Sequence, residues 1–407
     1  MNLMNMHLGE HLRLTLFGTS HGPKVGITLE GVPKGLEVDV EGIKKAMNTR
    51  RPGGRYASKR KEEDAVLVLS GVEHGRTTGE IVELSILNQD AKSKDYSFLP
   101  DHPRPGHQDM VMHKRTNGQA DLRGGGMSSA RLTAPLVAAA AFVAPLLTSR
   151  GIEIEAHVGA IGLVESNPMN TQPERWANEA CKEMRCRDPE AAKRMVEVVE
   201  HHRMNLNSVG SRVDVTVQGL PLGLGEPWFD GIEPAMARAM MSIPAARGVT
   251  FGRGFDVVRM TGKEHNDSWG GTPNAPVLLG DKPDGVLAGL ATGAPIHCSV
   301  AFKPPSSIAA KQVTLNINTG SMEPLVVKGR HDPVLGPRAV AVVEAMAMLV
   351  LTDLALRGGF IDERPRHHPQ IWWILPPRFI RPGSNRRGCW PLGWSINGGG
   401  LSLVGHH

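Results

Sequence analysis

The chain has 407 residues, of which 40% are hydrophobic, so it can bury a large core in one or two domains, and this composition excludes a disordered protein. Its formal net charge of +5 favours acidic ligands without naming one. The four cysteines form no CxxC pair and are too sparse for a disulfide framework, which indicates a reducing cytoplasm. The start does not resemble a signal peptide, and the longest apolar stretch is too short to span a bilayer, so we expect a cytoplasmic protein without a membrane segment.

The first ninety residues predict several short strands and one helix. Gly or Pro residues bound each strand, and some strands alternate with a period of two. The expected strands are 12–16, 24–29, 65–69 and 81–87, and the expected helix is 40–47. A long polar stretch with several prolines and glycines then runs from Asn88 to Met127, and we expect a loop of this length to be functional.

The rest of the chain alternates further strands with single helices. An Ala-rich helix should follow Ser129, with Pro135 and Pro145 near its first turn or at a kink. The other expected elements are strands at 152–158, 213–217, 250–258 and 297–302 and helices at 189–202, 232–241 and 338–356. Because there is no regular βαβ rhythm, the pattern favours an α+β fold. We expect one catalytic domain over residues 1–357 and a poorly ordered, atypical tail over 358–407, where tryptophans lie among Pro, Arg and Gly.

Two histidines lie on predicted turns next to a glycine, which has no side chain to obstruct a ligand. His21 is part of Gly-Thr-Ser-His-Gly after a predicted strand, and His107 is part of Arg-Pro-Gly-His-Gln-Asp. An imidazole in such a place can approach a ligand and exchange a proton near neutral pH. A hydrogen-bonded turn histidine is the alternative for His21.

Three further motifs suit an anionic ligand. The run from Arg50 to Lys61 places forked donors on a Pro-Gly turn, although a charge run is usually a solvated surface. Residues 123–131 read RGGGMSSAR and either cradle a phosphate or simply cap a helix. The motif KPPSS at 303–307 offers one ammonium and two hydroxyls, and Arg330 with Asp332 forms either an ion pair or a substrate clamp.

Taken together, the ordered motifs resemble those of chorismate synthases. These motifs are GTSHG, RRPGGRY, SGVEHGRTTG, RPGHQD, RGGGMSSAR, GLGEPWFD, KPPSSI and KGRHDP, and they run from about residue 12 to about residue 357. The resemblance implies an anti-1,4-elimination of phosphate from 5-enolpyruvylshikimate 3-phosphate that gives chorismate, the last common step of the shikimate pathway in aromatic amino acid biosynthesis. It also implies a requirement for reduced FMN without net oxidation, no metal, a β-α-β sandwich with helices between antiparallel sheets, and a homotetramer.

The resemblance also assigns roles to residues of this chain. His21 would protonate the departing phosphate, His107 would donate to the reduced flavin near N1, and Asp332 is a third catalytic candidate. The flavin N5 would take the proton from C6. The substrate anions would be held by Arg50, Arg55, Arg131 and Arg330. NADPH, as a reductant, would contact Arg50 and Arg55. Flavin contacts would come from Met127, Ser128, Ser129, Pro244, Ala245, Ala288, Lys303, Pro304, Pro305, Ser306, Ser307 and Arg330, so that with Arg50 and Arg55 these are the predicted cofactor-binding residues.

The chain departs from the family pattern at several of these positions. Met127 stands where arginine is common, Ala288 replaces a frequent glycine, and Pro135 interrupts a helix usually free of proline. The first alternative is therefore a weakened homologue that binds flavin or phosphorylated ligands without efficient turnover. The second is a basic protein that binds nucleic acid through residues 50–61, but an aromatic content of 4% leaves few side chains to stack on bases.

Overall fold

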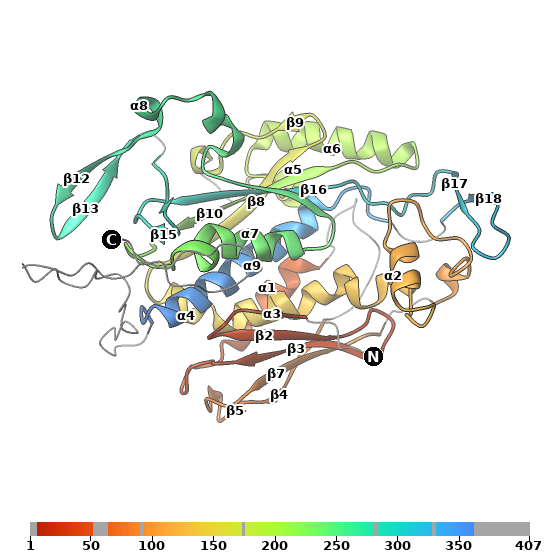
Figure 1. The fold of residues 1–407 in the computed structure, drawn as a ribbon, viewed down its shortest axis with the longest axis horizontal. Helices are drawn as coiled ribbons and strands as arrows, with labels where there is room; N and C mark the ends of the chain where they lie inside the picture. Colours follow the sequence, from red (N-terminus) through yellow and green to blue (C-terminus); the bar gives the residue numbers. More distant parts are fainter. Residues whose placement is uncertain are drawn as a thin grey trace, which may run out of the picture. The chain divides into compact units, whose positions relative to one another are not determined.

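The computed structural model describes residues 6–51, 64–89, 93–172, 176–280, 283–327 and 331–361. Two five-stranded sheets enclose a layer of helices, and every strand pairing within these two sheets is antiparallel (Figure 1). The predicted α+β sandwich is therefore confirmed.

The first sheet has the strand order β1-β2-β3-β7-β4. Its strands are β1 (His7–Leu8), β2 (Arg13–Gly18), β3 (Lys24–Glu30), β4 (Val66–Ser70) and β7 (Val82–Leu87). The alternation in β3 turns Val25, Ile27 and Leu29 inward, where all three are fully buried. Ile27 lies opposite Leu84 of β7, so the buried rows of neighbouring strands are in register.

The second sheet has the order β11-β16-β10-β8-β9. Its strands are β8 (Glu153–Ile161), β9 (Val164–Glu165), β10 (Ser211–Gln218), β11 (Ala246–Phe251) and β16 (Ile296–Phe302). Val158, Val213 and Val300 lie opposite one another across three of these strands and are fully buried. This valine row continues the core beneath the second sheet.

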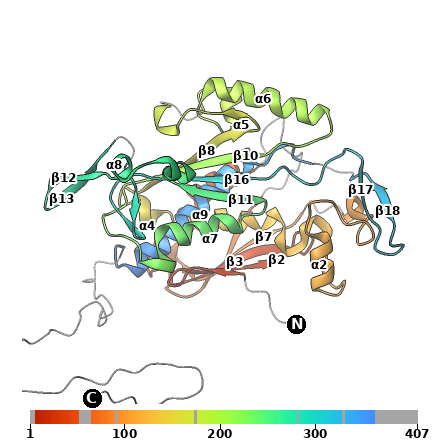
Figure 2. The ribbon, with the colours of Figure 1, turned by 45° about the horizontal axis from the view of Figure 1, so that its top comes forward.

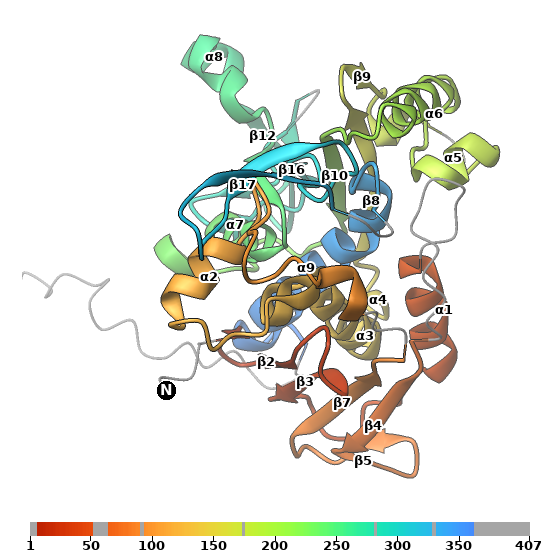
Figure 3. The ribbon, with the colours of Figure 1, turned by 90° about the vertical axis from the view of Figure 1, so that its right-hand side faces the viewer.

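Four helices fill the space between the sheets, as the view in Figure 3 shows. They are α1 (Val40–Arg50), α3 (Thr133–Val143), α7 (Ile232–Ser242) and α9 (Gly336–Arg357). The stretch 123–148 and helix α9 are long and apolar enough to cross a membrane, but 78% and 83% of their most apolar windows are buried inside the fold. Both are core helices of the fold.

The shorter elements lie around this sandwich. Helices α5 (Glu179–Met184) and α6 (Pro189–Met204) cover the outer side of the second sheet, while α2 (Asp109–Arg115) lies beside the hairpin of β17 (Gln312–Leu315) and β18 (Met322–Leu325) (Figure 2). The remaining elements are β5 (Val72–Glu73), β6 (Arg76–Thr77), α4 (Pro145–Thr148), α8 (Gly262–His265), β12 (Ser268–Thr272), β13 (Ala275–Leu279), β14 (Val286–Leu287), β15 (Leu290–Ala291) and the 3₁₀ segments Ser93–Tyr96, Arg123–Ser128, Ala130–Leu132, Met169–Thr171, Trp228–Asp230 and Gly254–Arg259.

A buried carboxylate at the far end of α9 anchors the beginning of the first sheet. Asp353 is 6% exposed and accepts hydrogen bonds from the backbone N–H groups of Glu10, His11 and Leu12, the last two at 2.7 and 2.8 Å. A charged acceptor makes stronger hydrogen bonds than a neutral one. The core helix thus fixes where the chain enters β2.

Most predicted elements are confirmed within a few residues. The helix predicted after Ser129 is split into α3 and α4, with Pro135 as the third residue of α3 and Pro145 as the first of α4. Both prolines therefore lie in a first turn, where a missing N–H costs no hydrogen bond.

The strand predicted at 250–258 is wrong beyond Phe251. Gly252 and Gly254 have φ of +52° and +56°, and the chain turns there into a 3₁₀ segment. Of the predicted tail, residues 358–361 are described, and Ile361 is 8% exposed against the core. Residues 362–407 lie outside the described part of the chain.

Candidate active site

A cavity of about 920 Å³ opens among the helices, the first sheet and three loops. One wall is apolar and includes Leu14 and Leu16 of β2, Leu136 of α3 and Met346 of α9. Most of the predicted site residues line the same cavity: Arg50, His107, Met127, Ser128, Ser129, Arg131, Pro244, Ala245, Lys303, Pro305, Ser306, Ser307 and Asp332. The fold thus brings together segments that are far apart in the chain.

Three predicted residues that the structure describes do not line the cavity, and two more lie outside the described residues. His21 lies directly behind two lining residues, and Pro304 is not itself among the lining residues. Ala288 lies in the turn between β14 and β15 with φ of +52°, a left-handed conformation that explains why glycine suits this position, and it does not line the cavity. Arg55 and Arg330 lie outside the described residues.

The turn that carries His21 is docked onto the glycine-rich loop. The Ser20 N–H donates to the Gly126 carbonyl at 3.1 Å, and its hydroxyl donates to the Arg123 carbonyl at 3.0 Å. The imidazole lies edge to face with Tyr96, with 5.2 Å between ring centroids. A Cβ atom on Gly124 would lie 2.6 Å from the ring, so this close approach requires glycine there. His21 is therefore held in one place beside the cavity.

Asn88 connects this turn to an arginine. Its amide nitrogen donates to the carbonyls of Thr19 and Gly22 at 3.0 and 2.8 Å, and its amide oxygen accepts from Nε of Arg131 at 2.9 Å. One side chain thus fixes the His21 turn and the Arg131 guanidinium relative to each other.

Two buried arginines share one carboxylate at the base of the cavity. Arg50 donates to Asp64 at 3.0 Å, and Arg131 donates to the other oxygen of the same carboxylate. The three residues are 5 to 7% exposed, and Arg50 also donates to the hydroxyl of Thr133 at 3.2 Å. Two guanidinium groups against one carboxylate leave one net positive charge, which favours an anionic ligand.

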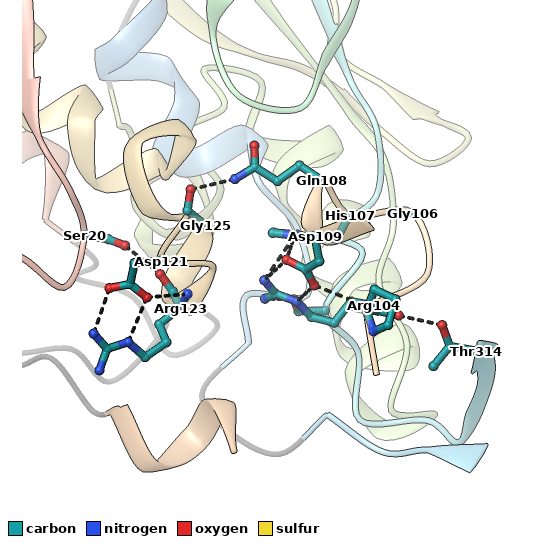
Figure 4. Close-up of polar contacts among 12 residues, drawn as sticks. Ser20, Arg104, Gly106, His107, Gln108, Asp109, Asp121, Arg123, Gly125 and Thr314 are labelled. Carbon is teal, nitrogen blue, oxygen red and sulfur yellow. Dashed lines mark hydrogen bonds and ion pairs between the residues drawn. The ribbon is translucent and has the colours of Figure 1, made fainter. Parts of the chain in front are cut away.

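His107 is part of a second buried network, shown in Figure 4. Its Nδ1 lies 2.6 Å from Asp109, and Arg104 donates to both oxygens of that carboxylate at 2.8 Å. Burial alone would raise the pKa of Asp109, but hydrogen bonds from Arg104 and His107 and their charges hold it well below its usual range. Because the ionised carboxylate accepts the Nδ1 proton, Nε2 is the ring nitrogen left for a ligand.

The glycine-rich loop has a backbone that other residues rarely adopt. Gly124, Gly125 and Gly126 have φ of +58°, +89° and +55°. Gln108 donates to the Gly125 carbonyl at 2.6 Å, which ties this loop to the one with His107 (Figure 4). Ser129 caps the short helical turn that follows by accepting from the N–H of Arg131. The capping alternative is thus confirmed, while Gly124, Gly125 and Ser129 also line the cavity.

The loop 303–307 closes the opposite side of the cavity. Lys303 Nζ donates to the Gly106 carbonyl at 2.6 Å, and Arg104 donates to the hydroxyl of Ser307 at 3.1 Å. Burial and the charge of Arg247 lower the pKa of Lys303, so two cationic side chains lie close together here. Arg238 also lines this side.

Asp332 is ion-paired, and its partner is a residue in the first turn of α9. Arg338 donates to it at 2.5 Å. Both residues line the cavity.

Sequence reasoning did not select several residues that the structure places in the site. They are Asp64, Asn88, Tyr96, Arg104, Asp109, Arg238, Arg247 and Arg338. Arg104 and Asp109 flank His107 in the RPGHQD motif, which is a usable signal. Among the described residues no group of three His, Cys, Asp or Glu side chains is arranged to hold a metal ion.

The fold is thus a helix-filled two-sheet sandwich with histidines and arginines gathered around one cavity. The family model described as chorismate synthase matches residues 12–356. Chorismate synthase of Aeropyrum pernix is 44% identical over 350 residues, covering 86% of this chain and 92% of that protein. That of Methanosarcina mazei is 41% identical over 357 residues, covering 88% and 97%. A crystal structure of chorismate synthase matches with a TM-score of 0.66 and 28% identity, covering 86% of this chain and 93% of that one. The chain belongs to the chorismate synthase family.

Proposed function

We propose that this enzyme catalyses the anti-1,4-elimination of phosphate from 5-enolpyruvylshikimate 3-phosphate, giving chorismate, and that it requires reduced FMN. The observation that carries the proposal is the convergence of three groups at one cavity: the turn with His21, the Arg50–Asp64–Arg131 cluster and the His107–Asp109 pair. The substrate has a phosphate and two carboxylates, and the cavity has an excess of guanidinium groups to receive them.

The residues present fit a flavin as well as a substrate. The cavity of about 920 Å³ lies near the upper end of the range of about 300 to 1,000 Å³ that is usual for ligand pockets. Its leucine-rich wall suits a flat ring system, and Lys303, Ser306 and Ser307 offer donors to a phosphate. Reduced FMN, when bound, supplies electron density to the substrate transiently and recovers it, so that no net oxidation results.

The chain's own residues then bind and orient the substrate and supply protons to it. The C3–O bond of the substrate breaks, a proton leaves C6, for which reduced flavin would be the acceptor, and the departing phosphate needs a proton. We assign that proton to His21, whose ring is fixed by Tyr96 and by the turn docked on the glycine-rich loop. As an imidazolium paired with Asp109 through Nδ1, His107 would also carry a proton on Nε2 and donate it to an acceptor in the cavity.

The decisive experiment is an anaerobic assay with 5-enolpyruvylshikimate 3-phosphate and chemically reduced FMN, following chorismate absorbance and released phosphate together. Equal amounts of both products, dependent on reduced flavin, support the proposal. Absence of both from folded protein at saturating flavin contradicts it and favours the weakened homologue. Met127 at the cavity, where family members commonly have arginine, is the residue that motivates this alternative.

We further propose that the enzyme works in the cytoplasm as a homotetramer, with NADPH as a reductant of the flavin and without a nucleic-acid or membrane partner. The buried cysteines Cys181, Cys186 and Cys298 are free thiols, which supports a reducing compartment. Of the basic run 50–61, only Arg50 and Arg51 are described, and Arg50 is buried against Asp64, where it cannot contact a nucleic-acid backbone.

A further inference from the structure

The β17–β18 hairpin connects two segments of the site without lining the cavity itself. In the chain it lies between the loop 303–307 and Asp332, both of which line the cavity. Its own faces contribute little to the core, since Val313 is 55% exposed and Met322 is 66% exposed. The hairpin must therefore have a structural role other than building the core or the cavity wall.

The hairpin is hydrogen-bonded to the chain just before Arg104. The hydroxyl of Thr314 donates to the Pro103 carbonyl at 2.6 Å, and Thr314 is buried. The Ile317 N–H donates to the Asp101 carbonyl at 2.9 Å. Figure 4 shows Thr314 pointing from β17 toward the loop with Arg104 and His107.

A carboxylate on β18 adds the third attachment. Glu323 lies 2.8 Å from Nε2 of His102 and accepts from Asn316 at 3.0 Å and from the hydroxyl of Thr319 at 2.9 Å. Hydrogen bonds from Asn316, His102 and Thr319 lower the pKa of Glu323 to about 2. It is therefore ionised near neutral pH and makes charge-assisted hydrogen bonds to its neighbours.

We propose that the β17–β18 hairpin is a clamp that positions His107, with Glu323 and Thr314 as positioning residues. The clamped segment runs through Pro103 and Pro105, whose fixed φ limits the loop's freedom, to Arg104 and His107. Arg104 donates to Asp109 and to the hydroxyl of Ser307. The segment with Arg104 and His107 is therefore held by the hairpin through Pro103 and by the loop 303–307 through Ser307. As far as it concerns turnover, this inference depends on the function proposed above.

The first test needs neither substrate nor flavin. Amide hydrogen exchange is measured by mass spectrometry on the full chain for peptides covering residues 99–109, in the wild type, Glu323→Ala, Thr314→Val and the double variant. One lost hydrogen bond changes a local opening equilibrium by about 2- to 10-fold, so each single variant should speed exchange in this segment by that factor and the double variant by more. Val313→Thr, at an exposed position of the same hairpin, is the matched control and should exchange like the wild type.

The second test separates positioning from binding and from folding. In the chorismate assay, Glu323→Ala and Thr314→Val should lower kcat several-fold while the KM for substrate stays within twofold, because the Arg50–Asp64–Arg131 cluster is untouched. His102→Gln, which keeps a donor toward Glu323, should retain more activity than His102→Ala.

Unchanged exchange at 99–109, or exchange that rises equally over the whole chain, would overturn the clamp. If the wild type makes no chorismate, the proposed function fails, while the exchange experiment still decides whether the hairpin holds this loop.

Discussion

Asp109 binds His107 and Arg104 with the same buried carboxylate, with contacts of 2.6 Å to the imidazole and 2.8 Å to the guanidinium. The side chain of Asp109 is fully buried and that of His107 is 22% exposed, so the carboxylate lies behind the imidazole and only the imidazole lines the cavity. The arrangement fixes both the orientation and the proton position of the imidazole before any ligand arrives.

The first prediction concerns Asp109 and acid stability. Its folded-state pKa lies below the ordinary value of 3.8, so it contributes stability that is present above pH 3.8 and is lost as the pH falls below it. Asp109→Asn should lower the free energy of unfolding by about 3 kcal/mol at pH 7, because Arg104 stays buried without its counter-charge. Urea unfolding at several pH values between about 6 and 2 should show the difference in unfolding free energy between wild type and variant narrowing below pH 3.8. A difference that stays constant over this range would contradict the assignment.

The second prediction concerns His21 as a proton donor. His21→Ala should lower turnover by about two to four orders of magnitude, the range expected for lost general acid catalysis. FMN binding, followed by flavin fluorescence, should stay largely intact because the residues assigned to the flavin, such as Lys303 and Ser306, are unchanged. Exposed His74, on the turn between β5 and β6, supplies the control His74→Ala, which should leave both readouts unchanged. Wild-type turnover in the His21 variant would exclude the role.

The third prediction concerns the shared carboxylate of the arginine cluster. Asp64→Asn removes the charge that both Arg50 and Arg131 contact, and we expect a loss of about 3 to 5 kcal/mol in unfolding free energy and a raised KM for substrate. Guanidinium chloride unfolding measures the first effect and steady-state kinetics the second. Glu41→Gln, which breaks the exposed pair with Lys44, should cost about 0.5 kcal/mol or less. Similar losses in the two variants would show that the cluster contributes no more than a surface pair.

The fourth prediction concerns where the chain can be shortened. Ile361 is buried, and its carbonyl accepts a hydrogen bond from Arg150, so a protein ending after Ile361 should keep its fold and activity. A protein ending after Arg357 loses this contact and the packing of Phe360, and its melting temperature should fall by several degrees. Thermal unfolding and the chorismate assay compare the two. If the longer protein is inactive or insoluble, residues beyond 361 contribute to the working enzyme.

The elements predicted correctly from the sequence are those in which apolar residues recur at a regular spacing or in which proline or glycine marks an end. The strand 24–29 alternates apolar residues, and the helix 338–356 begins near Pro337 and ends at Gly358, so both were confirmed as β3 and α9. The segment 250–258 is as apolar as a strand, yet Phe255 and Val258 are more than 80% exposed, because two glycines with positive φ end the strand at Phe251. Short elements such as α2 and the β17–β18 hairpin have too few residues for a period to show.

The residues of the candidate site also form two groups: those that sequence motifs predict and those that only the folded structure reveals. His21, Arg50, His107 and Arg131 are part of motifs, and the structure places them at or beside one cavity. Asp64 and Asn88 belong to no motif, and each matters only because folding places it between groups that are distant in the chain. Such bridging residues cannot be identified before the topology is known.

The anchor formed by Asp353 has a consequence for synthesis of the protein. The backbone groups it holds, at residues 10–12, precede it by more than 340 positions, so the entrance to the first sheet is completed only when nearly all of α9 has been translated. Ribosome-bound chains that lack α9 would expose the apolar face of the second sheet, since this helix packs against β8 and β10. We therefore expect the anchor at residues 10–12 to form late in synthesis, after α9 has been translated.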